Sequence, residues 1–377
     1  MAGVYISYPF CAQKCTYCNF ASGVFPRELE SRYLEALGSE IRGAQWPWIP
    51  ETVYLGGGTP SRMAPEALRD LLRQIPGKDL LGQIPGKDLL SQIPGNSWIE
   101  ATIEAAPGGI AFDSARAWRE AGINRVSLGV QSFDPRELAR TGRRHTAETV
   151  ASEIGALRAA GLSNLNVDLI AGLPSQTLQS WIRSLDWIER LNPPHVSIYM
   201  LEVDEDSRLG AEVLAFGKRY GAPDLPSEDA IADFYELAVE RLAALGIRRY
   251  EISNFARPGF ESRHNLKYWR REPYIGFGAD AHSFDGNLRR QNAETVTEYV
   301  HRIARGLSPE VVRSAAGSGE AFFLGLRLDE GVDVDWSRYR EGIERCMGAG
   351  LLEAQGRRLR LTPRGVLLSN EVFAEFV

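Results

Sequence analysis

Residues 4–20 read VYISYPFCAQKCTYCNF, a run of β-branched and aromatic residues followed directly by three closely spaced cysteines. The run at 4–8 predicts a buried strand, so Cys11, Cys15 and Cys18 are expected in the loop that follows it. Three thiolates cannot saturate a four-iron cluster, and one iron would keep a position for an exchangeable ligand. The spacing therefore favours a 4Fe-4S cluster with one open iron.

Two other uses of these cysteines compete with the cluster. A zinc site needs a fourth thiolate or histidine nearby, and residues 19 to 144 contain neither. A disulfide between cysteines three or four residues apart is unusual, and the N-terminal MAGVYISYPF lacks the features of a secretory segment. The remaining cysteine, Cys346, is interpreted as a small buried hydrophobe.

Strand-like runs alternate with helical patterns through the first two hundred residues. Strands are expected at 4–8, 52–55, 98–105, 125–130, 164–170 and 195–201, and helices at 29–41, 65–72, 112–121, 147–160 and 178–191. This alternation predicts βαβ units and a parallel sheet, an α/β fold. Because function gathers at the C-terminal ends of such strands, the cysteine loop lies where a site is expected.

The last third of the chain has a different pattern. An amphipathic helix is expected at 228–245, with Ser227 as its N-cap, and after about Gly286 the pattern becomes helical. A turn at 355–358 predicts a β-hairpin, followed by a closing helix from Pro363. We therefore expect a core domain at 1–285 and a small winged-helix-like α+β domain at 286–377.

Composition and repeats bound the function. The chain has 377 residues with 43 basic and 49 acidic side chains, and no basic tract predicts binding to nucleic acid. No apolar run approaches the roughly 20 residues of a transmembrane segment, and a reducing cytoplasm would protect the cysteines. The segment 74–95 repeats QIPGKDLLG, QIPGKDLLS and QIPG, and its Pro-Gly pairs predict a surface loop.

Glycines and polar residues recur where the expected strands end. The segment 55–61, LGGGTPS, follows the second strand, and only glycine lets backbone approach a ligand so closely. The candidate ligand-binding residues at the strand ends are Gly57, Gly58, Thr59, Glu104, Gln131 and Asp168. Each polar residue has the alternative of a hydrogen-bonded core side chain, but as a set they favour a ligand site.

Five segments together resemble one known family. YISYPFCAQKCTYCNF, YLGGGTP, IEAAPG, VSLGVQSF and VDLIAGLP occur in the order seen in the oxygen-independent coproporphyrinogen III oxidase family of radical S-adenosylmethionine (SAM) proteins. The resemblance covers nearly the whole chain. It implies a partial (β/α)6 TIM-like barrel in which SAM completes the cluster. It also implies cluster-bound SAM contacts for Tyr5, Gly57, Gly58, Thr59 and Glu104, and a second SAM site at Tyr17, Gln131, Arg143 and Asp168.

Two branches of this family differ in class. The oxidase branch decarboxylates two propionates of a porphyrinogen, whereas the HemW-type branch is a heme chaperone. Three features resemble the chaperone branch: Phe20 stands where the oxidase usually has another cysteine, only ten residues precede Cys11, and 263–269 reads RHNLKYW, which contains the HNxxYW signature. The resemblance therefore implies a protein that binds heme and transfers it to an unknown acceptor protein, with the oxidase as the alternative.

The segment 263–269 also has chemistry that suits heme. A neutral histidine is a common axial ligand of heme iron, and aromatic rings offer flat apolar faces to a porphyrin. We expect His264 as the leading heme ligand, with Asn265, Tyr268 and Trp269 around the ring.

Two cations and one further histidine complete this expectation. Arg263 and Lys267 would pair with the heme propionates. His282 lies in a glycine-rich stretch and has the alternatives of a second ligand or a SAM contact, but it is interpreted as more structural than functional. The alternative is a surface turn whose aromatic side chains simply pack down. The sequence leaves a homodimer and the cleavage of SAM open.

Overall fold

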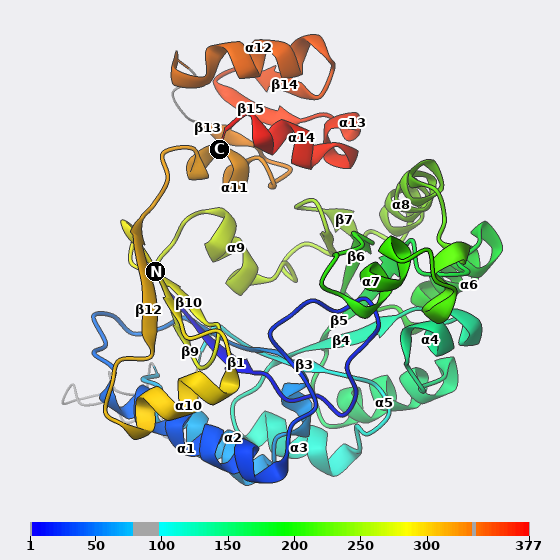
Figure 1. Ribbon diagram of the computed structural model, residues 1–377. Helices are drawn as coiled ribbons and strands as arrows, with labels where there is room; N and C mark the ends of the chain where they lie inside the picture. The colour runs from blue at the N-terminus through cyan, green and yellow to red at the C-terminus, as the bar shows by residue number, and fades with distance from the viewer. Residues whose placement is uncertain (1, 78–97, 334–336, 377) are drawn as a thin grey trace, which may run out of the picture.

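The computed structural model describes residues 2–77, 98–333 and 337–376, and its main body is one curved β-sheet covered by helices (Figure 1). The central strands are parallel and follow the order of the chain: β1 (Gly3–Tyr8), β2 (Thr52–Gly57), β3 (Glu100–Ala105), β4 (Arg125–Gln131), β5 (Asn164–Ala171) and β6 (His195–Met200). This is the strand order of a partial (β/α)6 barrel, and it confirms the expected α/β fold.

Further strands extend the sheet at both edges. β9 (Tyr274–Phe277) pairs in parallel with β1, and antiparallel strands β10 (His282–Phe284), β11 (Leu288–Asn292) and β12 (Glu310–Ala315) continue from it. At the other edge β8 (Asn254–Ala256) and β7 (Arg248–Arg249) follow β6.

The helices that connect the central strands cover the convex face of the sheet (Figure 1). They are α1 (Arg27–Gly43), α2 (Pro65–Leu72), α3 (Phe112–Glu120), α5 (Ala147–Ala159) and α6 (Leu178–Leu191), and α8 (Glu228–Ala244) follows β6. Each was predicted from the sequence, and its ends lie within two residues of the prediction. Ser227 caps α8 as expected, because its side chain accepts a hydrogen bond from the Ala230 amide.

Alternate residues of each strand face opposite sides of the sheet, which separates the core from the inner surface. Val4 and Ile6 are fully buried in the core. Tyr5, between them, lies in register with Tyr54 of β2, and the two rings stack with centroids 6.2 Å apart. The concave side near β1 and β2 is therefore lined by aromatic rather than aliphatic side chains.

Several elements were not predicted. They include α4 (Pro135–Thr141), α7 (Arg208–Leu214), α9 (Arg263–Trp269) and the 3-10 helices η1 (Pro60–Arg62), η3 (Arg219–Asp224) and η4 (Ser337–Tyr339). The helix α10 (Val296–Ala304) lies in the region after Gly286 that was expected to be helical. The expectation of a helical pattern after Gly286 is wrong where β11 and β12 form. Their residues are mostly polar or exposed, so they carry little of the alternation that identifies a half-buried strand.

The C-terminal part forms a small α+β unit with its own sheet. Its elements are α11 (Glu320–Gly325), β13 (Val332–Asp333), α12 (Arg340–Gly348), β14 (Leu352–Gln355), β15 (Arg358–Leu361), α13 (Pro363–Leu367) and α14 (Ser369–Ala374). The predicted hairpin is confirmed, because Gln355 pairs with Arg358, and the closing helix begins at Pro363 as expected.

The expected boundary at 285/286 falls in the turn between β10 and β11 of the main sheet. The sheet continues to Ala315, so we propose that the division between the two domains lies after β12. Of the repeat at 74–95, residues 78–95 lie outside the described residues. Among the described helices, none is long and apolar enough to cross a membrane.

Candidate functional site

The three cysteines of the motif lie in the loop after β1, at the C-terminal end of that strand. The Cys11 amide, at the start of the loop, donates a hydrogen bond to the Gly23 carbonyl, near its end, at 2.8 Å. The two ends of the loop are therefore held together. Cys11, Cys15 and Cys18 are free thiols and partly exposed, whereas Cys346 is buried as expected. Three free thiols in one short loop supply the donor atoms of a cluster with one open iron, but among the described residues no three Cys, His, Asp or Glu side chains are arranged to hold a metal ion.

The glycine-rich segment after β2 packs directly on the cysteine loop. A Cβ at Gly58 would lie 2.8 Å from the Pro9 carbonyl carbon and 2.9 Å from the Phe10 nitrogen. The Gly58 amide donates to the Tyr8 carbonyl at 2.9 Å, and the Thr59 amide donates to the Phe10 carbonyl at 3.0 Å. The two segments therefore form one backbone unit, and only glycine fits at position 58.

Glu104 lies near the end of β3, beside this unit. Its carboxylate accepts hydrogen bonds from the Tyr54 hydroxyl at 2.9 Å and from the Gly57 amide at 3.2 Å. Gly57 has a φ of 106°, a conformation that favours glycine. Burial raises the pKa of Glu104 to about 7, and the Asp168 carboxylate adds to the rise while the two hydrogen bonds oppose it. A carboxylate placed in this way suits an ammonium group such as that of SAM.

Tyr17, Gln131 and Arg143 come together on the neighbouring side of the cysteine loop. Arg143 donates to the Gly129 carbonyl at 2.6 Å, and Gln131 has a φ of 71° at an irregularity in the pairing of β4 with β5. Among the described residues, the Gln131 Oε1 and Arg143 Nε atoms are buried without a hydrogen-bond partner, as is the Tyr17 hydroxyl. Burial raises the pKa of Tyr17, and the Arg143 guanidinium beside it opposes the rise. Orphaned polar atoms of this kind fit a polar ligand.

Asp168, expected in the same group, has protein partners instead. Its two oxygens accept hydrogen bonds from Asn166 Nδ2 at 2.7 Å and from Ser127 Oγ at 3.2 Å. Burial raises the pKa of Asp168, and these hydrogen bonds oppose the rise. Asp168 therefore fits the alternative of a hydrogen-bonded core side chain, whereas Gln131, whose Oε1 has no partner among the described residues, does not.

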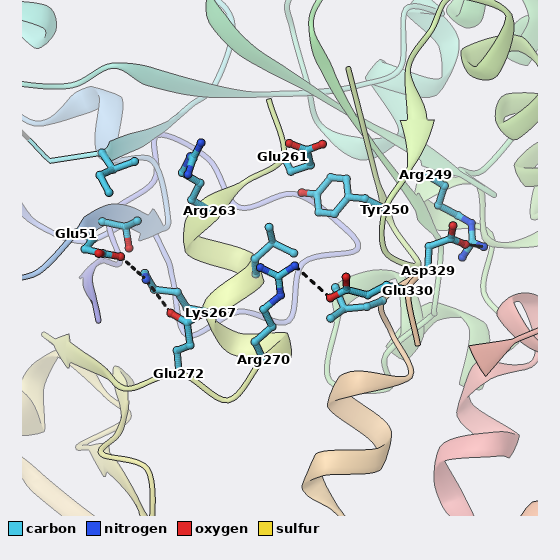
Figure 2. A pocket seen from close by; sticks show the side chains of 14 residues that line it. Glu51, Arg249, Tyr250, Glu261, Arg263, Lys267, Arg270, Glu272, Asp329 and Glu330 are labelled. Atoms are coloured by element: carbon cyan, nitrogen blue, oxygen red, sulfur yellow. Dashed lines mark hydrogen bonds and ion pairs between the residues drawn. The ribbon is translucent and has the colours of Figure 1, made fainter. Parts of the chain in front are cut away.

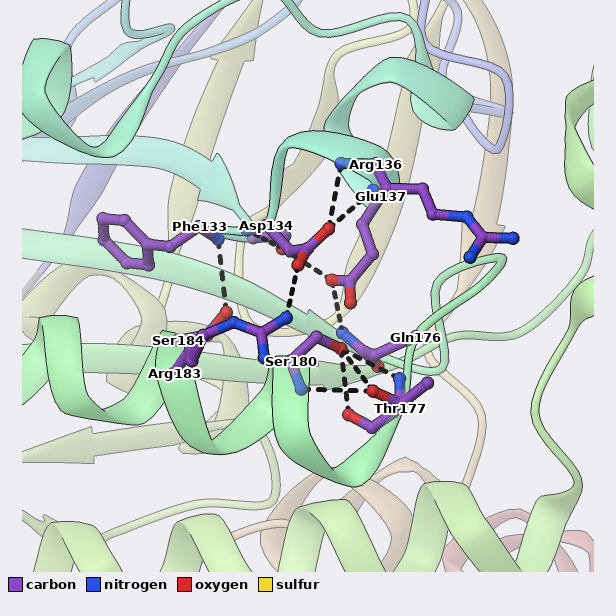
Figure 3. A network of polar contacts seen from close by, with 10 residues as sticks. Phe133, Asp134, Arg136, Glu137, Gln176, Thr177, Ser180, Arg183 and Ser184 are labelled. Atoms are coloured by element: carbon purple, nitrogen blue, oxygen red, sulfur yellow. Dashed lines mark hydrogen bonds and ion pairs between the residues drawn. The ribbon is translucent and has the colours of Figure 1, made fainter.

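A buried network holds the segment that leads to Arg143 (Figure 3). Glu137 of α4 is fully buried and accepts a hydrogen bond from Gln176 Nε2 at 3.1 Å, which ties α4 to the loop between β5 and α6. Asp134, the N-cap of α4, accepts one from Arg183 of α6 at 2.7 Å. These two contacts to the β5–α6 unit fix α4 in place. They thereby also restrain Arg143, which follows α4 closely in the chain.

The helix α9 carries the HNLKYW segment and lies between the concave side of the sheet and the C-terminal unit (Figure 1). His264 is 1% exposed, with Nδ1 at 2.9 Å from Thr52 Oγ1 and Nε2 at 2.7 Å from Tyr268 Oη. Its amide donates to Glu100 at 3.0 Å, and its ring stacks on Tyr54. Burial lowers the pKa of His264 to about 3, so the ring is neutral. Both ring nitrogens are engaged by protein atoms, an arrangement that favours the alternative in which this side chain packs down.

The two sides of α9 border two different cavities. The side facing a cavity of about 530 Å³ presents Arg263, Leu266, Lys267 and Arg270 (Figure 2). Lys267 is buried there between the carboxylates of residues 51 and 272, at 3.1 Å and 2.9 Å. The two cations expected to pair with heme propionates, Arg263 and Lys267, therefore lie on this charged side of the helix.

The other side of α9 presents Tyr268 and Trp269 to a cavity of about 440 Å³. We call this the aromatic cavity, and its wall consists of Tyr5, Tyr268, Trp269, Tyr274, Asp280, His282, Arg289, Glu320, Phe323 and Leu324. Tyr5 links it to the cluster side of the barrel, because that ring lies 3.0 Å from a Cβ placed on Gly56. Asn265, expected around the heme, is not among the described residues that line either cavity.

The sequence of this chain is similar to those of known proteins. Residues 5–188 match the radical SAM superfamily, and residues 319–368 match the HemN C-terminal domain. The heme chaperone HemW of Lactococcus lactis is 33% identical over 99% of this chain and 96% of that protein. The chain belongs to the HemW family. Members from Bacillus subtilis and Mycobacterium tuberculosis are 33% and 35% identical, over 100% and 98% of this chain and 99% and 93% of theirs.

The HemW family shares its fold with the oxidase branch. Coproporphyrinogen III oxidase HemN from Escherichia coli matches 100% of this chain and 89% of its own, with a TM-score of 0.79 and 21% identity. That likeness covers the barrel and the C-terminal unit together. The resemblance inferred from the sequence motifs is confirmed at the level of the HemW family, and the fold is one that both branches have.

Most of the aromatic cavity was not predicted from the sequence of this HemW-family chain. Tyr274, Arg289 and Glu320 were not singled out, and His282 was interpreted as more structural than functional. One signal was available: 285–286 reads Asp-Gly between short runs, which is typical of a tight β-hairpin turn, and it joins β10 to β11 here. The part of the cavity wall that comes from α11 could not be predicted from local sequence, because that helix meets the barrel only in the folded chain.

Proposed function

We propose that this chain binds heme in the aromatic cavity and passes it to an acceptor protein. The observation that carries the proposal is that Tyr268 and Trp269, from the segment with the HNxxYW signature, both line this cavity. Phe323 and Leu324 of the C-terminal unit add apolar surface to its wall. Its volume of about 440 Å³ falls in the range of small-molecule and cofactor sites, roughly 300–1,000 Å³.

We also propose a 4Fe-4S cluster held by Cys11, Cys15 and Cys18, with SAM on the open iron. Together these groups supply one-electron chemistry when bound. In this arrangement the Glu104 carboxylate holds the SAM ammonium group, and Gly58 keeps the cysteine loop against the glycine-rich segment. The match to the radical SAM superfamily and the partly exposed free thiols support this part of the proposal.

Further contacts belong to the proposed SAM sites. Tyr5 lines the aromatic cavity and lies beside the glycine-rich segment, so it would border both heme and SAM. The unpartnered polar atoms of Tyr17, Gln131 and Arg143, within the part of the chain that the structure describes, support a second polar ligand beside the cluster. A reducing compartment such as the cytoplasm suits three free thiols in a cluster loop.

A paired assay on the anaerobically reconstituted protein tests the proposal. Hemin is titrated and followed by its absorbance, and coproporphyrinogen III turnover is measured with SAM and a reductant. Stoichiometric heme binding without turnover supports the chaperone. Turnover without heme binding would make the chain an oxidase, the function named for the structural relative from Escherichia coli, and would reject the proposal.

A further inference from the structure

We infer that His282, rather than His264, is the side chain that binds the heme iron. The inference rests on the proposed heme-binding function. His282 is exposed and lines the aromatic cavity together with Tyr268 and Trp269. An imidazole binds iron through a free ring nitrogen, and in His264 both nitrogens are engaged by Thr52 and Tyr268.

The β10–β11 hairpin presents His282 on one face with three other side chains. His282 pairs with Gln291 across the ladder, and Phe284 pairs with Arg289. Residues two apart on a strand, and residues directly opposite one another, point to the same side of a sheet. Arg289 lines the aromatic cavity, so the face shared by these four side chains is the one that borders it.

The backbone around His282 is held by a close approach and an uncommon turn. A Cβ at Gly276 would collide with the His282 carbonyl oxygen, so only glycine lets β9 pass so close to that residue. Asp280 has a φ of 57°, and its carboxylate accepts a hydrogen bond from Gln291 at 2.9 Å. An uncommon conformation at a residue other than glycine persists where the surroundings fix it, often at ligand sites. The close approach at Gly276 and the turn at Asp280 fix the backbone that carries His282. The His282 side chain is exposed, so the packing of the core does not explain why its backbone is fixed.

The remaining wall suits a porphyrin with acidic side chains. The Trp269 Nε1 atom is buried and has no hydrogen-bond partner among the described residues, while Arg327 packs over the ring at 4.3 Å. Arg289 and Arg271 lie 2.7 Å and 3.8 Å from the one carboxylate of Glu320. Of these two guanidinium groups Arg289 lines the cavity, where Asp280 and Glu320 are the acidic side chains, so Arg289 is the cation of the described lining that can meet a propionate.

The other cavity beside α9, of about 530 Å³, is a weaker place for heme iron. None of the described residues that line it is a histidine, and the buried Lys267 is already paired with two carboxylates. The aromatic cavity has both a histidine and flat apolar surfaces. Iron ligation is therefore assigned to the β10–β11 side.

The test is a hemin titration of the full-length protein with three histidine variants, followed by absorbance and electron paramagnetic resonance. His282→Ala is expected to lose the signature of histidine-ligated heme and to raise the Kd for hemin by about tenfold or more. Added imidazole is expected to restore that signature, because it can occupy the space left by the side chain. His301→Ala is the matched control, since His301 is exposed on α10 and is not among the described residues that line either cavity.

The variants separate this inference from the proposed function. If the wild-type protein does not bind hemin, the proposed function itself fails. If the wild type binds hemin and His282→Ala shows the same spectrum and Kd, only the inference fails. His264→Ala is expected to keep the histidine signature, and its circular dichroism reports whether it folds. A folded His264→Ala protein that loses the signature, with His282→Ala unchanged, would assign the iron to His264.

Discussion

Replacing Gly58 with alanine is predicted to displace the cysteine loop and reduce the cluster content of the reconstituted protein. The added Cβ would lie 2.8 Å from the Pro9 carbonyl carbon and 2.9 Å from both the nitrogen and the oxygen of Phe10. All three neighbours are backbone atoms, so no side-chain rotation relieves the contact. One of the two segments must move, and Cys11 follows Phe10 directly.

The magnitude follows from the cost of overpacking. Inserting a methyl group into a well-packed site typically costs about 1–3 kcal/mol, and contacts with backbone leave little room for relaxation. Gly109→Ala is the matched control, because a Cβ at Gly109 would meet nothing within 4 Å and its φ lies outside the left-handed region. That variant is expected to change the free energy of unfolding by less than about 1 kcal/mol.

Two measurements check the prediction. Urea unfolding gives the free energy of unfolding, and iron and sulfide analysis after anaerobic reconstitution gives the cluster content. Gly58→Ala is expected to be lower than wild type in both, and Gly109→Ala is expected to match wild type in both. A Gly58→Ala protein with wild-type stability and a full cluster would refute the argument that this close approach requires glycine.

Three further predictions concern the cluster, the SAM site and the charged cavity. Serine in place of any of the three loop cysteines should abolish the cluster absorption at about 400 nm, whereas Cys346→Ser should retain it. Because burial raises the pKa of Glu104 to about 7, the folded state binds more protons than the unfolded state at mildly acidic pH. The free energy of unfolding should therefore fall as pH rises from about 4.5 to about 7, and urea titrations should find this component missing in Glu104→Gln. Lys267→Met should lower the free energy of unfolding by up to about 3 kcal/mol in urea titrations, because it leaves two carboxylates unpaired, and should leave hemin binding unchanged. As a control, Arg116→Ala breaks an exposed ion pair and should stay within about 0.5 kcal/mol of wild type.

The barrel could be predicted because its strands carry the signal in their own residues. Strands β1 to β6 are largely buried runs between helices with clear periodicity, so their positions follow from local sequence. The edge strands differ. β11 reads LRRQN and β12 is mostly exposed, and they form strands through pairing with their neighbours. Local sequence contains little of that information, which is why this region was expected to be helical.

The candidate site divides in the same way. The cysteine loop and the glycine-rich segment each follow a predicted strand, so their contact at Gly58 follows from the order of neighbouring strands. The aromatic cavity combines β1, α9, the β10–β11 hairpin and α11, which come from opposite ends of the chain. Nothing in the residues near position 282 shows that α11 will lie opposite them.

The HNLKYW segment shows how a motif can mark a site without supplying its reactive atom. A histidine in a short motif suggests a ligand, but whether its nitrogens are free depends on what the rest of the chain places beside them. Here α9 follows Ser262, and the Glu100 carboxylate binds the amides of the helix start, which fixes His264 against the side chain of residue 52. The same anchoring places Trp269 at the aromatic cavity. The motif residues therefore build part of the cavity wall, and in the proposed heme site the iron ligand comes from another part of that wall, where His282 is exposed.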